Sequence, residues 1–113
     1  MNTSSQTTLR AQSSPVLLLA QLLADRPDLP AVTYHIDSII PGELAIHVHH
    51  GRFDQFETWR VVLGLSDVEV RTFGQSTWVD VAGTVADVPV RLTGHGTAAE
   101  VASYVAGLSA VAA

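Results

Sequence analysis

The stretch that decides the fold is residues 68–94, VEVRTFGQSTWVDVAGTVADVPVRLTG. Valines and other apolar residues alternate with polar ones, which is the pattern of strands that bury one face. The alternation is interrupted at Gly74-Gln75 and at Ala86-Asp87, and each pair suits a two-residue hairpin turn. Three consecutive antiparallel strands are therefore expected, over about residues 67–73, 76–85 and 88–94.

The two turns support each other because each one fixes a register. The first turn pairs Val70 with Val79, and the second pairs Val81 with Leu92. Both registers give the middle strand the same buried face, and agreement between independent signals favours the prediction. Pro89 has no backbone N–H to donate, so the last strand is expected at an edge of the sheet or with that position turned outward.

A further hairpin is predicted from residues 35–50, HIDSIIPGELAIHVHH. A three-residue loop from Pro41 to Glu43 pairs Ile36 with Val48 and gathers the apolar residues on one face, whereas a two-residue loop mixes the faces. The three-residue loop is therefore preferred. The two strands are expected over about residues 31–40 and 44–50.

Helix signals flank both sets of strands. Ser14 followed by Pro15 is typical of a helix start, and Gly64 suits the left-handed position that ends a helix. Apolar residues recur at helical spacing in each segment. Helices are expected over about residues 14–25, over residues 52–63, and after the capping box formed by Thr97 and Glu100.

The predicted fold class is α+β. A single mostly antiparallel five-stranded sheet with helices on one face accounts for the order α-β-β-α-β-β-β-α, and the order of the strands across the sheet is left open. Residues 1–13 are polar and aperiodic, so a disordered N-terminal tail is expected there. Residues 14–113 are expected to form one domain.

The composition excludes several classes of function. The chain has 113 residues, a net charge of −5 and no cysteine, so disulfides and thiolate metal sites are excluded. Its six basic residues are all arginine and are scattered, whereas direct binding of nucleic acid requires clustered positive charge. Neither a bilayer-spanning run nor an export signal is recognisable. A cytoplasmic protein without membrane contact is therefore expected.

Four of the five histidines lie within residues 35–50. The predicted register places His35, Asp37, His47 and His49 on the uncovered face of the sheet, with His35 opposite His49 and Asp37 opposite His47. Nitrogen and oxygen ligands at this spacing suit zinc or another divalent transition metal. The same side chains are also ordinary on the exposed side of a strand, so a metal site, a pH-sensitive surface and a plain polar surface all stay open.

The uncovered face is also predicted to carry partner-binding residues. Arg71 lies opposite Trp78, in reach of a cation–π contact, and Trp78 lies opposite His95 in the next strand pair. Tryptophan and arginine are enriched at the centres of interfaces. A protein partner, or a second copy in a homodimer, is expected to bind there, and the alternative is a tryptophan that only covers its neighbours.

Two segments, WRVVLGL (59–65) and TWVDVAGTVADVPVRLTGHG (77–96), resemble small uncharacterised α+β proteins of actinobacteria and their phages or mobile elements. The resemblance rests on a valine-rich hairpin, a pattern that only a limited range of sequences can satisfy. It implies a source rather than an activity, and it transfers no functional residue.

These features favour a small acidic, non-enzymatic protein–protein interaction or regulatory module, such as an adaptor or inhibitor. The alternative is a metal- or small-ligand-binding protein, including a metalloenzyme, that uses the histidine and aspartate patch. The sequence contains no phosphate-binding loop, dinucleotide fingerprint or catalytic serine motif, so no catalytic residue is predicted.

Overall fold

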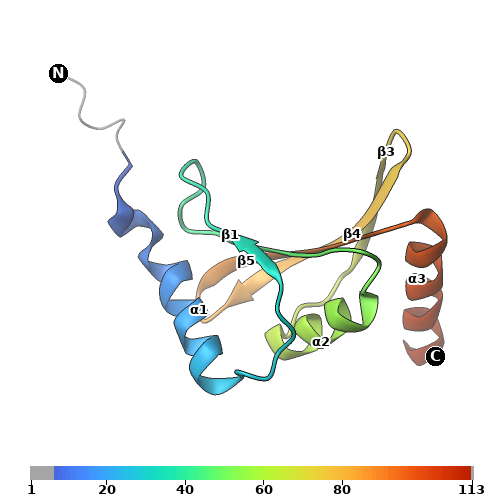
Figure 1. Cartoon of the computed structure of the whole chain (residues 1–113), viewed down its shortest axis with the longest axis horizontal. Helices are drawn as coiled ribbons and strands as arrows, with labels where there is room; N and C mark the ends of the chain where they lie inside the picture. The colour runs from blue at the N-terminus through green and yellow to red at the C-terminus, as the bar shows by residue number, and fades with distance from the viewer. Residues whose placement is uncertain (1–6, 113) are drawn as a thin grey trace.

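The computed structural model describes residues 7–112 as an α+β fold with a five-stranded sheet and three α-helices (Figure 1). The expected tail falls partly on residues 1–6, which lie outside the described residues. Within the rest of that segment, Leu9–Gln12 form a short 3-10 helix and Ser13 begins the first α-helix. In chain order the elements are η2 (Leu9–Gln12), α1 (Ser13–Asp25), β1 (Thr33–His35), β2 (Leu44–Val48), α2 (Phe53–Leu63), β3 (Glu69–Phe73), β4 (Ser76–Val85), β5 (Val88–Gly96) and α3 (Ala98–Ala112).

The strand order across the sheet is β1-β2-β5-β4-β3. Three neighbouring pairs are antiparallel, but β2 pairs with β5 in parallel, with Ile46 opposite Leu92. The sheet is therefore mixed, and the prediction of a mostly antiparallel sheet is wrong at its centre. The β2–β5 pair joins segments that are distant in sequence, so no turn residue could have indicated it. β5 is an internal strand and not an edge strand. Pro89 is exposed and lies just before Val90, where the pairing with β2 begins, so its missing N–H interrupts no hydrogen bond to β2.

The three-strand meander of β3, β4 and β5 has the predicted register. Val70 pairs with Val79, and Val81 pairs with Leu92. The first turn has Gly74 at φ +62°, in the left-handed region that glycine enters without strain. The second turn places Ala86 at φ +50° and Asp87 at φ +66°. Two consecutive positive φ angles are the mark of a type I′ turn, which normally uses asparagine and glycine.

We expect Ala86→Asn to raise the free energy of unfolding by about 0.5–1 kcal/mol, because alanine at positive φ is strained and asparagine tolerates that conformation. Urea unfolding of the purified protein measures the change. The same residue introduced as Thr84→Asn, in the strand two positions earlier, should give no gain. A gain at both positions would show that strain in the turn is not the cause.

The first hairpin differs from its prediction. β1 is three residues long and pairs Tyr34 with Ile46, and residues 36–43 form a loop. The predicted pairing of Ile36 with Val48 is therefore wrong by four positions, although the even shift leaves each residue on its expected face. The physical reason lies in Asp37, whose Oδ1 accepts a hydrogen bond of 2.7 Å from the N–H of Ile39. This local turn ends the strand before the ladder can extend.

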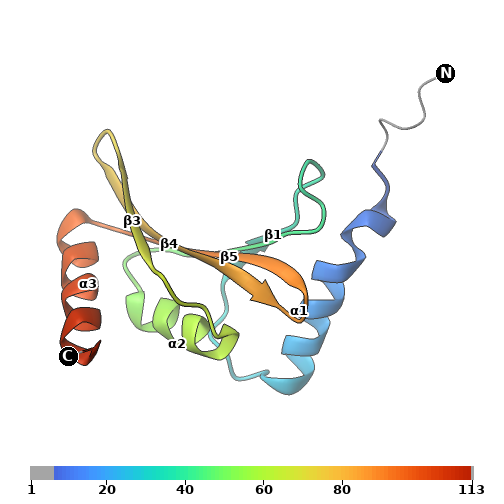
Figure 2. The same ribbon diagram turned by 180° about the vertical axis from the view of Figure 1, so that it is seen from behind.

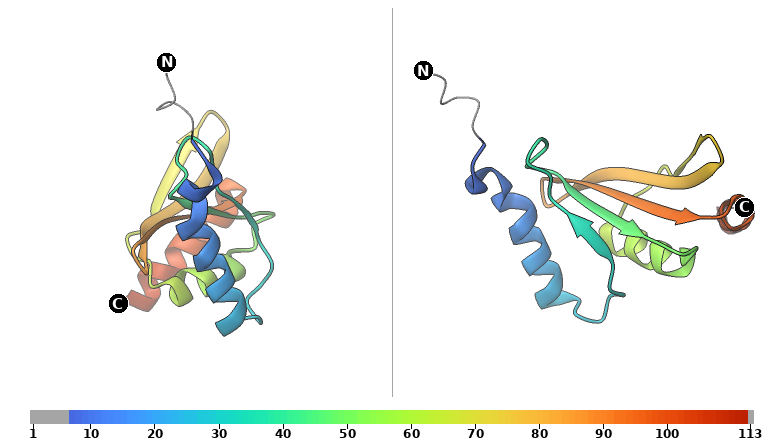
Figure 3. Two further views of the ribbon diagram at one scale, coloured as in Figure 1. Left: turned by 90° about the vertical axis from the view of Figure 1, so that its left-hand side faces the viewer. Right: turned by 45° about the horizontal axis from the view of Figure 1, so that its top comes forward.

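The helices lie on one face of the sheet. Figure 3 shows α1 and α3 at opposite ends of the molecule with α2 between them. Leu18 of α1, Phe56 of α2 and Val101 of α3 belong to one apolar core, which they share with the strands. On α1, Leu19 and Leu22 also pack against this core, whereas Val16 and Leu23 are exposed. The strand residues of the core are Leu44, Ile46, Val48, Val79, Val81, Val88, Val90 and Leu92.

Close contact between α2 and the sheet depends on Gly94 of β5. A Cβ atom at this position would lie 2.8 Å from a ring carbon of Phe53 and 2.9 Å from one of Phe56. Both distances are shorter than real Cβ contacts allow, so only glycine lets the helix approach this closely. Gly94 therefore determines the distance between helix and sheet, while the next residue, His95, points to the opposite face.

The sheet face away from the helices is concave. Figures 1 and 2 show that the β3–β4 turn and the loop of residues 36–43 both rise on the side away from α2, at the two edges of the sheet. Among the residues that the structure describes, no helix is long and apolar enough to cross a membrane.

Candidate functional site

The uncovered face of the sheet, called the open face below, carries most of the polar side chains predicted to be functional. Alternation along the strands and the observed pairing place them there. At the centre of this face Asp80 and Thr93 are buried, and His47, Trp78 and His95 are half-buried. The side chains that form the open face include Thr33, His35, Ala45, His47, His49, Glu69, Arg71, Phe73, Trp78, Asp80, Arg91, Thr93 and His95.

Four imidazole rings, those of His35, His47, His49 and His95, form what we call the histidine stack. Nδ1 of His47 lies 3.0 Å from Nε2 of His95, so one nitrogen donates a hydrogen bond to the other. The His47 and His95 ring centroids are 5.3 Å apart, with an angle of 16° between the planes. The His35 ring lies 5.2 Å from that of His47, and the His49 ring lies 4.9 Å from that of His95, both nearly parallel.

The membership of the stack follows from the parallel β2–β5 pair. His47 and His49 point the same way because they are two positions apart on one strand. His47 lies opposite Thr93, which brings His95 beside the two β2 histidines. Sequence reasoning assigned His95 only to partner binding, and it missed this residue as a neighbour of the other histidines. No local signal could have revealed the contact, since 48 positions separate His47 from His95.

The predicted four-residue metal patch is not brought together as expected. Asp37 does not lie opposite His47, because it belongs to the loop after β1, and His35 lies opposite Ala45 instead of His49. Within the part of the chain that the structure describes, no three histidine, aspartate or glutamate side chains are arranged to hold one metal ion. Asp37 instead lines a hollow beside the stack, together with His35, Ile40, Glu43, Ala45, His47 and Arg91.

The electrostatic environment favours neutral imidazoles at the centre of the stack. Burial, followed by the proximity of His95, His35 and His49, lowers the pKa of His47 below its usual value. Burial also lowers the pKa of His95, with a further contribution from His49. Asp80 opposes both shifts without cancelling them. If both rings of the His47–His95 pair were protonated, two N–H donors would face each other.

We expect the free energy of unfolding to fall as the pH is lowered from about 7.5 to about 5.5. The unfolded histidines take up protons below their ordinary pKa of 6.5, whereas the folded pair does so only at lower pH. The contribution of the neutral pair to the free energy of unfolding is therefore fully present above pH 6.5, and it is lost progressively as the pH falls below this value. Urea unfolding at both pH values measures this, and ordinary carboxylates stay largely ionised throughout.

The double variant His47→Gln with His95→Gln should lose most of this pH dependence. Thr33→Gln changes the same face without a titratable group, and it should keep the wild-type dependence. An equal pH dependence in the wild type and the double variant would contradict the assignment to this pair.

Arg71 and Trp78 lie opposite each other, as predicted, and Trp78 lies opposite His95. The guanidinium of Arg71 is held by carboxylates, with 2.8 Å to Glu69 Oε2 and 2.8 Å to Asp80 Oδ2. Asp80 also accepts hydrogen bonds from Thr93 Oγ1, at 2.8 Å, and from the indole N–H of Trp78, at 3.3 Å. Arg71 thus neutralises the facing pair of acids, and the network fixes Trp78 against the sheet.

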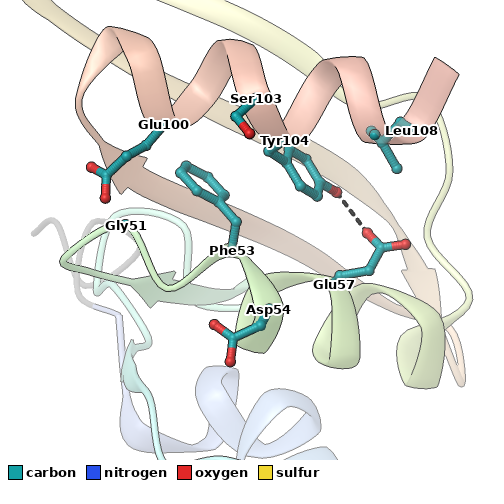
Figure 4. Close-up of a pocket in the computed structure, with 9 residues that line it drawn as sticks. Gly51, Phe53, Asp54, Glu57, Glu100, Ser103, Tyr104 and Leu108 are labelled. Carbon is teal, nitrogen blue, oxygen red and sulfur yellow. Dashed lines mark hydrogen bonds between the residues drawn. The ribbon is translucent and has the colours of Figure 1, made fainter. Parts of the chain in front are cut away.

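A second hollow, of about 530 Å³, lies between α2 and α3 (Figure 4). Phe53 and Tyr104 stack across it with ring centroids 5.1 Å apart, and the Tyr104 hydroxyl donates a 2.6 Å hydrogen bond to Glu57. Arg60 also pairs with Glu57, and this contact lowers the pKa of that carboxyl. Burial raises the pKa of Tyr104 well above its usual value. Because Glu57 is already occupied, we assign these groups to holding the two helices together.

The sequence predicted the capping box beside this hollow, but not the hollow itself. Glu100 accepts a 2.8 Å hydrogen bond from the N–H of Thr97, and the Thr97 hydroxyl accepts one of 3.1 Å from the N–H of Glu100, as predicted. Glu100 also lies against Gly51, where a Cβ would approach its carboxylate to 2.1 Å.

Neither a protein-family model, nor a curated protein, nor a solved structure matches the chain. The resemblance to small actinobacterial and phage proteins stays a prediction. Any function must be argued from the residues of the open face themselves.

Proposed function

We propose that the chain is a non-enzymatic protein–protein interaction or regulatory module that binds its partner on the open face of the sheet. The observation that carries this proposal is the histidine stack beside Trp78 on a concave face, with a raised element at each edge. Flat aromatic and heteroaromatic rings supply contact area at a low cost in side-chain entropy, which is why such residues are common in binding surfaces. The acidic net charge supports a protein as the partner, and a cytoplasmic setting without nucleic acid or membrane contact belongs to the same proposal.

The chemistry of the face specifies the kind of segment it would bind. Neutral imidazoles both donate and accept hydrogen bonds, and their ring faces are apolar. The charged groups nearest the centre, Arg71 and Asp80, already neutralise each other. The face therefore suits an uncharged segment of the partner that offers backbone amide groups and apolar side chains. We expect binding to weaken as the pH is lowered until His47 and His95 become charged.

Affinity capture from a lysate of the source organism tests the proposal when variants are compared side by side. His47→Ala and Trp78→Ala should each lose a protein that the wild type retains. Arg26→Ala changes an exposed residue after α1, on the helical side, and should keep it. A captured protein that is retained by both open-face variants, or lost equally in the control, would show that the open face is not the binding surface.

The close approach of His47 to His95 favours a second candidate function, binding of zinc or another divalent transition metal. The two ring nitrogens are 3.0 Å apart, and His49 is the nearest further imidazole. Small rotations of the His47, His95 and His49 rings would bring three nitrogens to one ion. Calorimetric titration of metal-free protein with zinc distinguishes the candidates. Saturable micromolar binding that disappears in His95→Ala and survives in Asp37→Ala would support this site, and no saturable heat would exclude it.

A further inference from the structure

β3 is an edge strand whose two faces are both exposed. All five of its residues are exposed, including Val70 at 49 % on the helical side and Phe73 at 81 % on the open face. The opposite edge of the sheet is formed by β1, which has only three residues. Folded proteins commonly protect a long edge strand with a proline, a bulge or a covering element. Glu69–Phe73 contains no proline, and it pairs residue for residue with β4.

The hairpin turn determines which backbone groups of β3 are free. Phe73 and Ser76 flank the two-residue turn, so the carbonyl of Phe73 points toward β4. Hydrogen-bonding direction alternates along a strand. Glu69, Arg71 and Phe73 therefore bond to β4, whereas the N–H and C=O groups of Val70 and Thr72 point away from the sheet. An antiparallel strand added at this edge would pair with those outward groups.

The charges of β3 are complementary to a second copy of the same strand in one register. A two-fold axis at Val70 places Val70 opposite Val70 of the other copy and Glu69 opposite Arg71, twice. A two-fold axis at Arg71 would instead place two arginines opposite each other. Moving the axis to Thr72 would bring the turn residues into the pairing and use less of the strand. Within one chain the Glu69 and Arg71 side chains pair with each other at 2.8 Å. Both are more than half exposed, at 64 % and 51 %, so the two copies can exchange these ion pairs across the edge.

We propose that the protein forms a homodimer by antiparallel pairing of β3 with β3 of a second copy, centred on Val70. The pairing joins the two sheets into one continuous sheet. Because the axis is perpendicular to the sheet, both open faces lie on the same side of the dimer. Self-association therefore uses the sheet edge and the β3 side chains at the margin of the open face, and it leaves the histidine stack and Trp78 free. This proposal does not depend on the partner proposed above.

Sedimentation equilibrium tests the dimer with the full-length protein. We expect concentration-dependent dimerisation of the wild type. Val70→Pro should weaken it more than tenfold, because the two central hydrogen bonds are lost. Proline at Val70 removes an N–H that β4 does not use, so the melting temperature should change little, and Val70→Thr, which keeps the N–H, should dimerise like the wild type.

Charge reversal gives an independent measurement if the proline variant is unstable. Glu69→Arg alone should weaken the dimer about tenfold at low salt, because each cross-strand pair becomes repulsive. Adding Arg71→Glu restores opposite charges across the axis and should return the affinity to within about threefold of the wild type. A monomeric wild type, or a dimer unaffected by Val70→Pro and Glu69→Arg, would overturn the proposal. A dimer lost in Trp78→Ala and kept in Val70→Pro would place self-association on the open face and would also overturn it.

Discussion

Phe56→Ala is expected to lower the free energy of unfolding by about 3–5 kcal/mol, the usual cost of removing a fully buried phenylalanine. The Phe56 side chain has no exposed surface and lies in the centre of the core between α2 and the sheet. It also makes edge-to-face contacts with Phe53 and Tyr104, with ring centroids 6.1 Å and 5.4 Å away. Urea unfolding monitored by circular dichroism measures the loss.

The matched control is Phe73→Ala, the same substitution at an exposed phenylalanine. Phe73 is 81 % exposed at the end of β3, and its loss should change the stability by less than about 0.5 kcal/mol. Both proteins should be measured at a concentration low enough to keep the wild type monomeric. Comparable losses in the two variants would mean that α2 does not pack on the sheet through Phe56.

Gly94→Ala is expected to lower the free energy of unfolding by about 1–3 kcal/mol, through overpacking and not through a cavity. The added methyl group would meet Phe53 and Phe56 at 2.8 and 2.9 Å and would also lie 3.1 Å from Val79. The helix must therefore move away from β5, and the core contacts that it makes must loosen. The same urea measurement gives the size of the effect.

Gly42→Ala provides the comparison, because a Cβ at Gly42 meets nothing within 4 Å. This variant should be neutral or slightly stabilising, since alanine restricts the unfolded chain more than glycine does. A combined variant, Gly94→Ala with Phe53→Leu, should recover part of the loss by making room for the methyl group. No recovery, together with a neutral Gly94→Ala, would show that the close approach is not a constraint.

The parts of the fold that could be predicted are those encoded by local signals. Turn residues and alternation determined the β3–β4–β5 meander, because hairpin registers depend on residues close in sequence. The left-handed cap at Gly64, with φ +68°, and the capping box before α3 were predicted for the same reason. The predicted length and register of the first hairpin were wrong because Asp37 closes a local turn. The alternation of apolar residues does not show whether a strand continues or ends.

The candidate site was predicted in its residue types and its face, but not in its contacts. The alternation of side chains along each strand placed His35, His47 and Trp78 on the open face. The error in the register of the first hairpin was four positions, an even number, so it did not move any side chain to the other face. The proximity of His47 to His95 depends on the parallel β2–β5 pair. Parallel neighbours are joined by long connections instead of turns, so they leave no signature at a fixed spacing. The hollow between α2 and α3 was missed because it depends on how two helices dock.

The parallel β2–β5 pair also has a consequence for the order in which the chain folds. β3, β4 and β5 follow one another and can form through short loops, whereas β2 must close a connection that contains α2 and the whole β3–β4 hairpin. Contacts that are distant in sequence generally form late. A chain in which only the meander has formed would contain Trp78 and its ion-pair network, while His47 would still be far from His95. The histidine stack combines residues of β1 and β2 with His95 of β5, so it forms only when folding is complete. A partner that requires the stack would therefore bind the folded protein and not the partly folded chain.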